Sequence, residues 1–124
     1  MASLADLTPP IALGSLDGRY RRAVAPLVDH LSEPALNRTR LHVEIEWLIH
    51  LTAHQVVPGA GTLSEAEAAS LRGLVEEFDQ AAIEELAAIE AETVHDVKAI
   101  EYFLKRRLTD RLENRGDLAE LVHF

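Results

Sequence analysis

Hydrophobic residues recur at steps of three and four along most of the chain, which is the spacing of one face of an α-helix. The first such stripe consists of Leu41, Ile45, Leu48 and Leu51, widened by Val43 and Trp47. Ser32 before Pro34 is typical of a helix start, and Pro58 before Gly59 ends a helix. The pattern therefore predicts a helix from about residue 33 to about residue 55 with a broad buried face.

A second helical pattern begins at Ser64, which has capping-box spacing with Glu67. Its apolar members are Leu71, Val75, Phe78, Ala82, Leu86 and Ile89. Because these steps follow one another without interruption, they predict a single helix to about Glu90, the longest of the chain.

Two shorter patterns flank these helices. An apolar repeat over residues 21–31 favours a short helix with Pro26 in its first turn. Thr93, with Asp96 three residues later, favours a capped helix whose apolar side includes Ile100 and Leu104. A last apolar repeat, Leu118, Leu121, Val122 and Phe124, has no polar cap after it. It predicts the start of a further helix in a chain that is cut short.

Residues 1–20 show no helical repeat and contain Pro9-Pro10 and Asp17-Gly18, which are signals of extended or turning chain. The composition, 48% hydrophobic with 5% aromatic residues, is dominated by strong helix formers. The sequence thus predicts an all-α protein of one domain, with an extended arm over residues 1–20 and a helical domain over residues 21–124.

Charge and composition exclude several functions. A net charge of −9 disfavours nucleic-acid binding, and the lack of cysteine excludes disulfides, cysteine zinc sites and a thiol nucleophile. No apolar run reaches membrane-spanning length and no leader is visible, so we expect a cytoplasmic protein without membrane contact.

Residues 15–20, Ser-Leu-Asp-Gly-Arg-Tyr, interrupt the helical pattern with polar chemistry. A turn at Gly18 would present Arg19, whose planar fork suits phosphate or carboxylate, and Tyr20, whose ring can stack. The alternative is an ordinary Asp-Gly turn with a solvated arginine.

Residues 93–98, Thr-Val-His-Asp-Val-Lys, join the two later helices. A helix start offers free backbone N–H groups to an anion, and His95 and Lys98 add donors. The alternative is that Thr93 and Asp96 only cap the helix, with His95 on the surface.

His50 and His54 have the i, i+4 separation of two metal ligands. No nearby acidic residue or third histidine completes a site, so we expect polar surface residues and predict neither a metal site nor a cofactor.

Three segments resemble the N-terminal part of the adenylosuccinate lyases, a branch of the fumarase/aspartase superfamily, in their longer bacterial form. They are Ser-Leu-Asp-Gly-Arg-Tyr at 15–20, Val-Glu-Ile-Glu-Trp-Leu at 43–48 and Thr-Val-His-Asp-Val-Lys-Ala-Ile-Glu-Tyr at 93–102. Two positions depart from that pattern: Leu16 replaces a proline, and Val94 stands where this branch often has asparagine.

The resemblance implies a carbon–nitrogen lyase that eliminates fumarate from adenylosuccinate, giving AMP, and from succinyl-aminoimidazole-carboxamide ribotide in purine biosynthesis. It assigns substrate binding to Arg19, Tyr20, His95 and Asp96, and to Val94 through its backbone. The family's acid histidine and its base serine, which stands on a mobile loop, both lie well downstream of this region. The family's enzymes are homotetramers whose active sites collect segments from three subunits around a helical bundle. We therefore expect a fragment that is inactive alone.

Two other functions are compatible with the residues themselves. One is a stand-alone helical module that binds a partner helix through an apolar stripe. The other is a complete small enzyme for an anionic metabolite, but its arginines, Arg19, Arg38, Arg40 and Arg72, form no single cluster by helical spacing.

Overall fold

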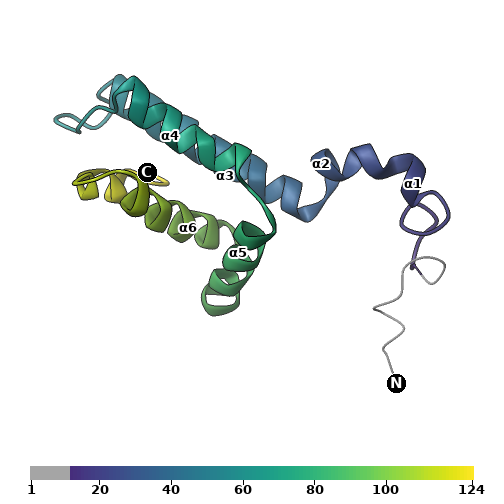
Figure 1. The fold of residues 1–124 in the computed structure, drawn as a ribbon. Coiled ribbons are helices and arrows are strands. Elements are labelled where there is room, and N and C mark those ends of the chain that lie inside the picture. The colour runs from purple at the N-terminus through teal and green to yellow at the C-terminus, as the bar shows by residue number, and fades with distance from the viewer. Residues whose placement is uncertain (1–11) are drawn as a thin grey trace. The chain divides into compact units, whose positions relative to one another are not determined.

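A computed structural model describes residues 12–124 (Figure 1), and the predicted all-α class is confirmed, with no strand in this part of the chain. The α-helices are α1 Arg21–Val24, α2 Val28–Leu31, α3 Glu33–Ala53, α4 Glu65–Glu76, α5 Gln80–Thr93 and α6 Asp96–Arg111. Two 3₁₀ helices span Ala25–Leu27 and Gly116–Leu121.

The chain divides into two units, one ending at Leu36 and one spanning Asn37–Phe124, and each is described by itself. In the first unit the helix predicted over residues 21–31 is broken into α1, a 3₁₀ turn and α2, because Pro26 lies within the segment and favours the turn. The Ser32 hydroxyl accepts a hydrogen bond from the Ala35 amide at 3.2 Å, which starts α3 as predicted. Of the arm predicted over residues 1–20, residues 1–11 lie outside the described residues.

Helix α3 confirms the predicted stripe, since Leu41, Ile45, Leu48 and Leu51 are fully buried. The prediction that Val43 and Trp47 widen this buried face is wrong. Their side chains are 60% and 40% exposed. A residue two positions after a core residue is rotated by about 200° around the helix, and it therefore lies on the opposite face.

The single helix predicted from residue 64 to residue 90 is wrong: it is two helices. The capping box of Ser64 and Glu67 forms as predicted, with hydrogen bonds of 2.8 and 3.1 Å. The helix ends at Glu76, and Asp79 then caps α5 by accepting from the Ala82 amide at 3.0 Å. The apolar spacing continues in register across this break, so periodicity alone does not reveal it.

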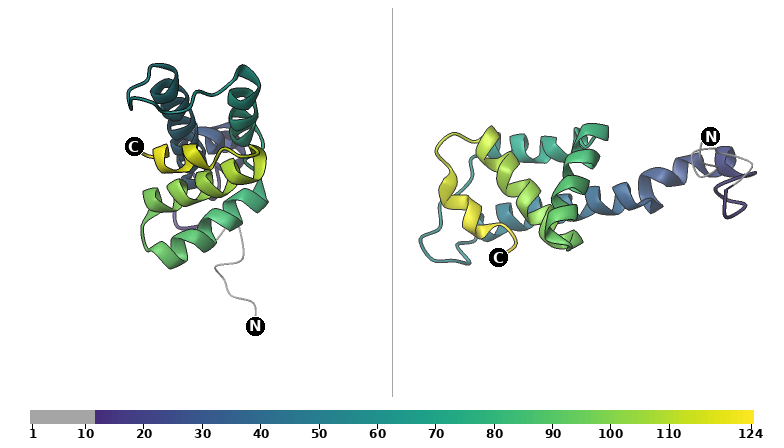
Figure 2. Two further views of the ribbon diagram at one scale, coloured as in Figure 1. Left: turned by 90° about the vertical axis from the view of Figure 1, so that its left-hand side faces the viewer. Right: turned by 90° about the horizontal axis from the view of Figure 1, so that it is seen from below.

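The second unit is a helical assembly in which α4 runs back along α3, and α5 and α6 form a further antiparallel pair (Figure 2). Its core combines the inner faces of all four helices with the C-terminal segment, residues 112–124. The buried side chains outside α3 are Leu71, Leu74, Ala82, Leu86, Ile89, Ala99, Ile100, Phe103, Leu104, Leu108, Leu112, Leu118, Leu121 and Val122.

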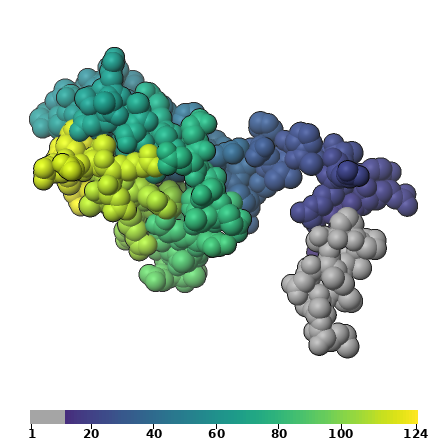
Figure 3. Space-filling view, in the orientation of Figure 1, coloured from purple at the N-terminus to yellow at the C-terminus, as the bar shows by residue number. Residues whose placement is uncertain are grey.

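The C-terminal segment forms a 3₁₀ helix instead of the predicted start of an α-helix. Leu118, Leu121 and Val122 are buried in the core of the same unit, and Phe124 remains 68% exposed. Arg115 holds the segment to the first turn of α4 through Glu67 at 2.8 Å and to the α3–α4 loop through the Thr62 carbonyl at 3.0 Å. Figure 3 shows these last residues, in yellow, lying beside the teal surface of α4.

Among residues 12–124, none of the helices combines the length and the hydrophobicity that crossing a bilayer requires.

Candidate substrate-binding site

The segment Ser-Leu-Asp-Gly-Arg-Tyr folds into consecutive turns ahead of α1. The Ser15 carbonyl accepts from the amides of Gly18 at 3.3 Å and Tyr20 at 3.0 Å. Gly18 does not adopt the positive φ that a sharp left-handed turn would need; among the described glycines only Gly59 does. Gly18 is buried instead, and a Cβ there would lie 3.3 Å from the Gly14 carbonyl oxygen. This position therefore favours glycine because the Gly14 carbonyl lies close to it, and not because of a positive φ.

Arg19 and Tyr20 leave these turns as exposed side chains, and half of the Tyr20 surface is accessible. Within the described part of the chain, no hydrogen bond or ion pair engages the Arg19 guanidinium. The neighbouring Asp17 pairs with Arg21 at 3.4 Å and so does not neutralise Arg19. The first unit thus presents a cation and an aromatic ring side by side in sequence.

The α5–α6 junction differs from the predicted cap. Thr93 is the last residue of α5, and its hydroxyl donates to the His95 carbonyl at 3.1 Å. Val94 follows in the left-handed conformation, with φ 51° and ψ 34°, and its side chain is 87% exposed. His95 is the actual cap of α6, since its Nδ1 accepts from the Lys98 amide at 3.1 Å. Sequence reasoning chose Thr93 because threonine is a common cap and histidine is not.

The capping contact fixes the chemistry of His95. An Nδ1 that accepts a hydrogen bond carries no hydrogen, so the neutral ring bears its hydrogen on Nε2. The side chain is 63% exposed. His95 can therefore offer one donor to a ligand while it holds the helix start in place.

Asp96 occupies the first turn of α6 and is held from two sides. One carboxylate oxygen accepts from the Val97 amide at 2.8 Å, and the other pairs with Arg40 of α3 at 2.8 Å. These two contacts lower the pKa of Asp96 below its ordinary value. Because Val97 and Lys98 have their amides engaged by side chains, the helix start is not the open anion site that the sequence predicts.

Lys98 is engaged by a neighbouring carboxylate as well. Its amino group contacts Glu101 at 2.8 Å, and Lys105 contacts the same carboxylate at 3.0 Å. Burial raises the pKa of Glu101, but the hydrogen bonds from the two lysines outweigh it and lower the pKa overall. Lys98, Glu101 and Lys105 thus form a group of ion pairs within α6.

The structure brings Val94, His95 and Asp96 together with Arg40, whereas Arg19 and Tyr20 belong to the first unit. Sequence reasoning missed the role of Arg40, because its contact with Asp96 joins residues far apart in the sequence and depends on how α3 packs against α6. Among residues 12–124, no group of three or more acidic or histidine side chains is placed to hold a metal.

The backbone of Val94 is strained, because a β-branched residue in the left-handed region costs about 1–2 kcal/mol. Val94→Asn is expected to raise the unfolding free energy by about 1 kcal/mol, since asparagine tolerates this conformation and the exposed valine loses no packing. A melting curve measures the change. Val56→Asn, at an exposed valine with no positive φ, is the control. An equal gain in both variants would show that strain is not the cause.

Comparison with known proteins gives one consistent result, although no protein-family model matches the chain. The adenylosuccinate lyase of Haemophilus influenzae is 38% identical over 113 residues, which cover 91% of this chain and 25% of that protein. The enzymes of the same name from Escherichia coli and Dictyostelium discoideum are each 33% identical, over 96% and 91% of this chain. The chain spans about a quarter of the length of the curated relatives it matches.

Proposed function

We propose that this chain, which is homologous to a portion of adenylosuccinate lyase over more than nine-tenths of its length, is the N-terminal substrate-binding portion of such an enzyme. The homology is the observation that carries the proposal. The complete enzyme would be a cytoplasmic homotetramer in purine biosynthesis. It would eliminate fumarate from adenylosuccinate, giving AMP, and from succinyl-aminoimidazole-carboxamide ribotide.

The elimination breaks a carbon–nitrogen bond. A general base removes the proton beside a carboxylate of the succinyl group, and a general acid protonates the departing nitrogen. We assign both groups to parts of the enzyme outside this chain, an acid histidine and a base serine. The role of this chain in the reaction is to bind the nucleotide.

Five residues carry that binding in our proposal. Arg19 meets the phosphate with its planar fork, which no described partner occupies, and the exposed Tyr20 contacts the nucleotide beside it. His95 donates through Nε2. Val94 contributes its carbonyl oxygen, because its amide already donates to the Glu90 carbonyl at 2.8 Å. Asp96 orients this junction through Arg40 and the Val97 amide.

Arg19→Ala is expected to weaken binding of AMP and adenylosuccinate to the complete enzyme by about tenfold or more, since a charged hydrogen-bonded contact is worth about 1.5–3 kcal/mol. Calorimetry and the KM for adenylosuccinate measure the loss.

Arg22→Ala is the matched control, because Arg22 is another exposed arginine three residues later, in α1. Equal binding by the parent and the Arg19 variant, with an unchanged melting temperature, would refute the assignment of Arg19 to the nucleotide.

A second function is favoured by one observation. Val43 and Trp47 form an exposed apolar surface on α3, which a helical interaction module would use to bind a partner. Such a module would not respond to AMP. If Trp47→Ala abolished partner binding and no nucleotide bound to the complete protein, the interaction module would replace the lyase proposal.

A further inference from the structure

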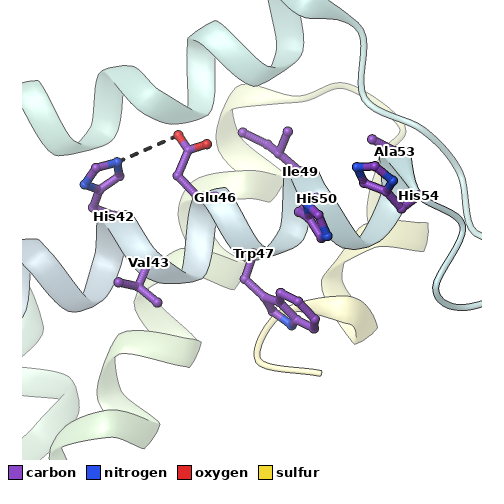
Figure 4. A pocket seen from close by; sticks show the side chains of 8 residues that line it. All are labelled: His42, Val43, Glu46, Trp47, Ile49, His50, Ala53 and His54. Atoms are coloured by element: carbon purple, nitrogen blue, oxygen red, sulfur yellow. Dashed lines mark ion pairs between the residues drawn. The ribbon is translucent and has the colours of Figure 1, made fainter.

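The face of α3 that points away from the core carries two histidines on consecutive turns. The ring centres of His50 and His54 are 4.2 Å apart, and the Trp47 ring stacks on His50 with its centre 6.0 Å away (Figure 4). Both histidines are exposed and belong to the concave surface that this face forms with His42, Val43 and Glu46. The α-helical geometry extends to His54, whose amide donates to the His50 carbonyl at 3.0 Å.

The ring nitrogens of this pair are available. Among residues 12–124, no hydrogen bond or ion pair engages the imidazole of His50 or His54. A neutral imidazole has one nitrogen lone pair, so two such rings on one face offer two ligands.

Glu46, one turn before His50, is a carboxylate at matching spacing that the sequence analysis overlooked. It is not a third ligand, because Arg72 holds its two oxygens at 2.6 and 2.8 Å. Its pKa is lowered, chiefly by the Arg72 hydrogen bonds, so the group stays ionised and paired with Arg72. The chain as a whole attracts cations, with a net charge of −9.

We propose that His50 and His54 bind one divalent transition-metal ion, with Cu²⁺ preferred over Ni²⁺ and Zn²⁺, and with water in the remaining coordination positions. Two metal–nitrogen bonds of about 2 Å need ligand nitrogens about 3 Å apart. Rings with centres 4.2 Å apart reach that separation by rotation about their side-chain bonds. Imidazole ligands suit all three ions, and the stability order of divalent metals places Cu²⁺ first. The site lacks a third protein ligand, which argues against a closed structural site. In our proposal solvent molecules occupy the remaining coordination positions.

Trp47 makes the proposal directly measurable, because it is the only tryptophan of the chain and it stacks on one of the two ligands. The tag-free full chain is titrated with CuCl₂ at neutral pH while its fluorescence is followed. We expect saturable quenching that ends at one Cu²⁺ per chain and is reversed by excess chelator.

Variants separate this site from weak surface binding. His50→Gln and His54→Ala are each expected to weaken Cu²⁺ binding by at least about tenfold, because the second ligand then no longer acts within one molecule. His42→Ala is the matched control, since His42 lies on the same face but contacts Glu46, at 3.8 Å. Its affinity for Cu²⁺ should equal that of the parent.

An electron paramagnetic resonance spectrum of the Cu²⁺-loaded parent does not depend on any variant folding, and it should report two nitrogen ligands. The proposal is overturned by quenching that does not saturate in the parent, by unchanged affinity in both histidine variants, or by a spectrum without imidazole nitrogen.

Discussion

The 124-residue chain alone is expected to release no fumarate from adenylosuccinate. The elimination requires a general acid and a general base on either side of the bond that breaks. In the described part of the chain, His95 uses its Nδ1 as a helix cap, and the hydroxyls of Ser32 and Ser64 cap α3 and α4. Arg19 and Tyr20 are assigned to binding the substrate, and the acid histidine and base serine are assigned to parts of the enzyme outside this chain.

The assay follows fumarate formation with the purified chain, and the adenylosuccinate lyase of Haemophilus influenzae is the positive control. Fumarate release that persists through purification and disappears in His95→Ala would contradict the expectation. It would mean that this chain contains its own catalytic groups.

Phe103→Ala is expected to have the largest effect on stability. Phe103 is 1% exposed and is the largest of the fully buried side chains. Its ring meets Phe78 edge-on with centres 6.2 Å apart and lies under the Arg107 guanidinium at 5.1 Å. Removing a buried phenylalanine side chain costs about 3–5 kcal/mol, which is a large part of the stability of a small domain. Urea unfolding of the chain measures the loss.

Tyr102→Ala is the matched control for this experiment. Tyr102 is the adjacent aromatic residue of α6, is 39% exposed, and contacts Lys98 only through a cation–π interaction at 5.2 Å. We expect a clearly smaller cost there than at Phe103, because the Tyr102 ring is partly exposed. Similar losses in both variants would mean that the α5–α6 pair does not build the core as described.

Much of the fold could be predicted because local chemistry and tertiary packing agree. The buried stripe of α3, its Ser32 cap and the capping box at Ser64 each follow from residues a few positions apart. The break before Asp79 could not be predicted from periodicity, since the apolar register of α4 continues into α5. Its only local signal is Asp79 itself, a good cap residue within an otherwise helical pattern.

The assignment of the two segments to a binding site stays a prediction, and only part of their local structure could be foreseen. Polar residues that interrupt the helical periodicity marked the turns at Arg19-Tyr20 and the helix junction at His95-Asp96. The left-handed Val94 could not be foreseen, because valine is among the residues least suited to that conformation. The capping nitrogen of His95 and the Arg40–Asp96 pair were also missed, since the first uses an uncommon cap residue and the second joins two helices.

The most direct test of the central claim is to determine the coding sequence beyond codon 124. The chain covers about a quarter of the length of its relatives. Our account therefore predicts that the reading frame continues beyond codon 124 for roughly three times the present length. The continuation should contain the acid histidine and the base serine that we assign to parts of the enzyme outside this chain. A stop codon directly after Phe124 would contradict the account, and a self-contained binding module would then be the better explanation.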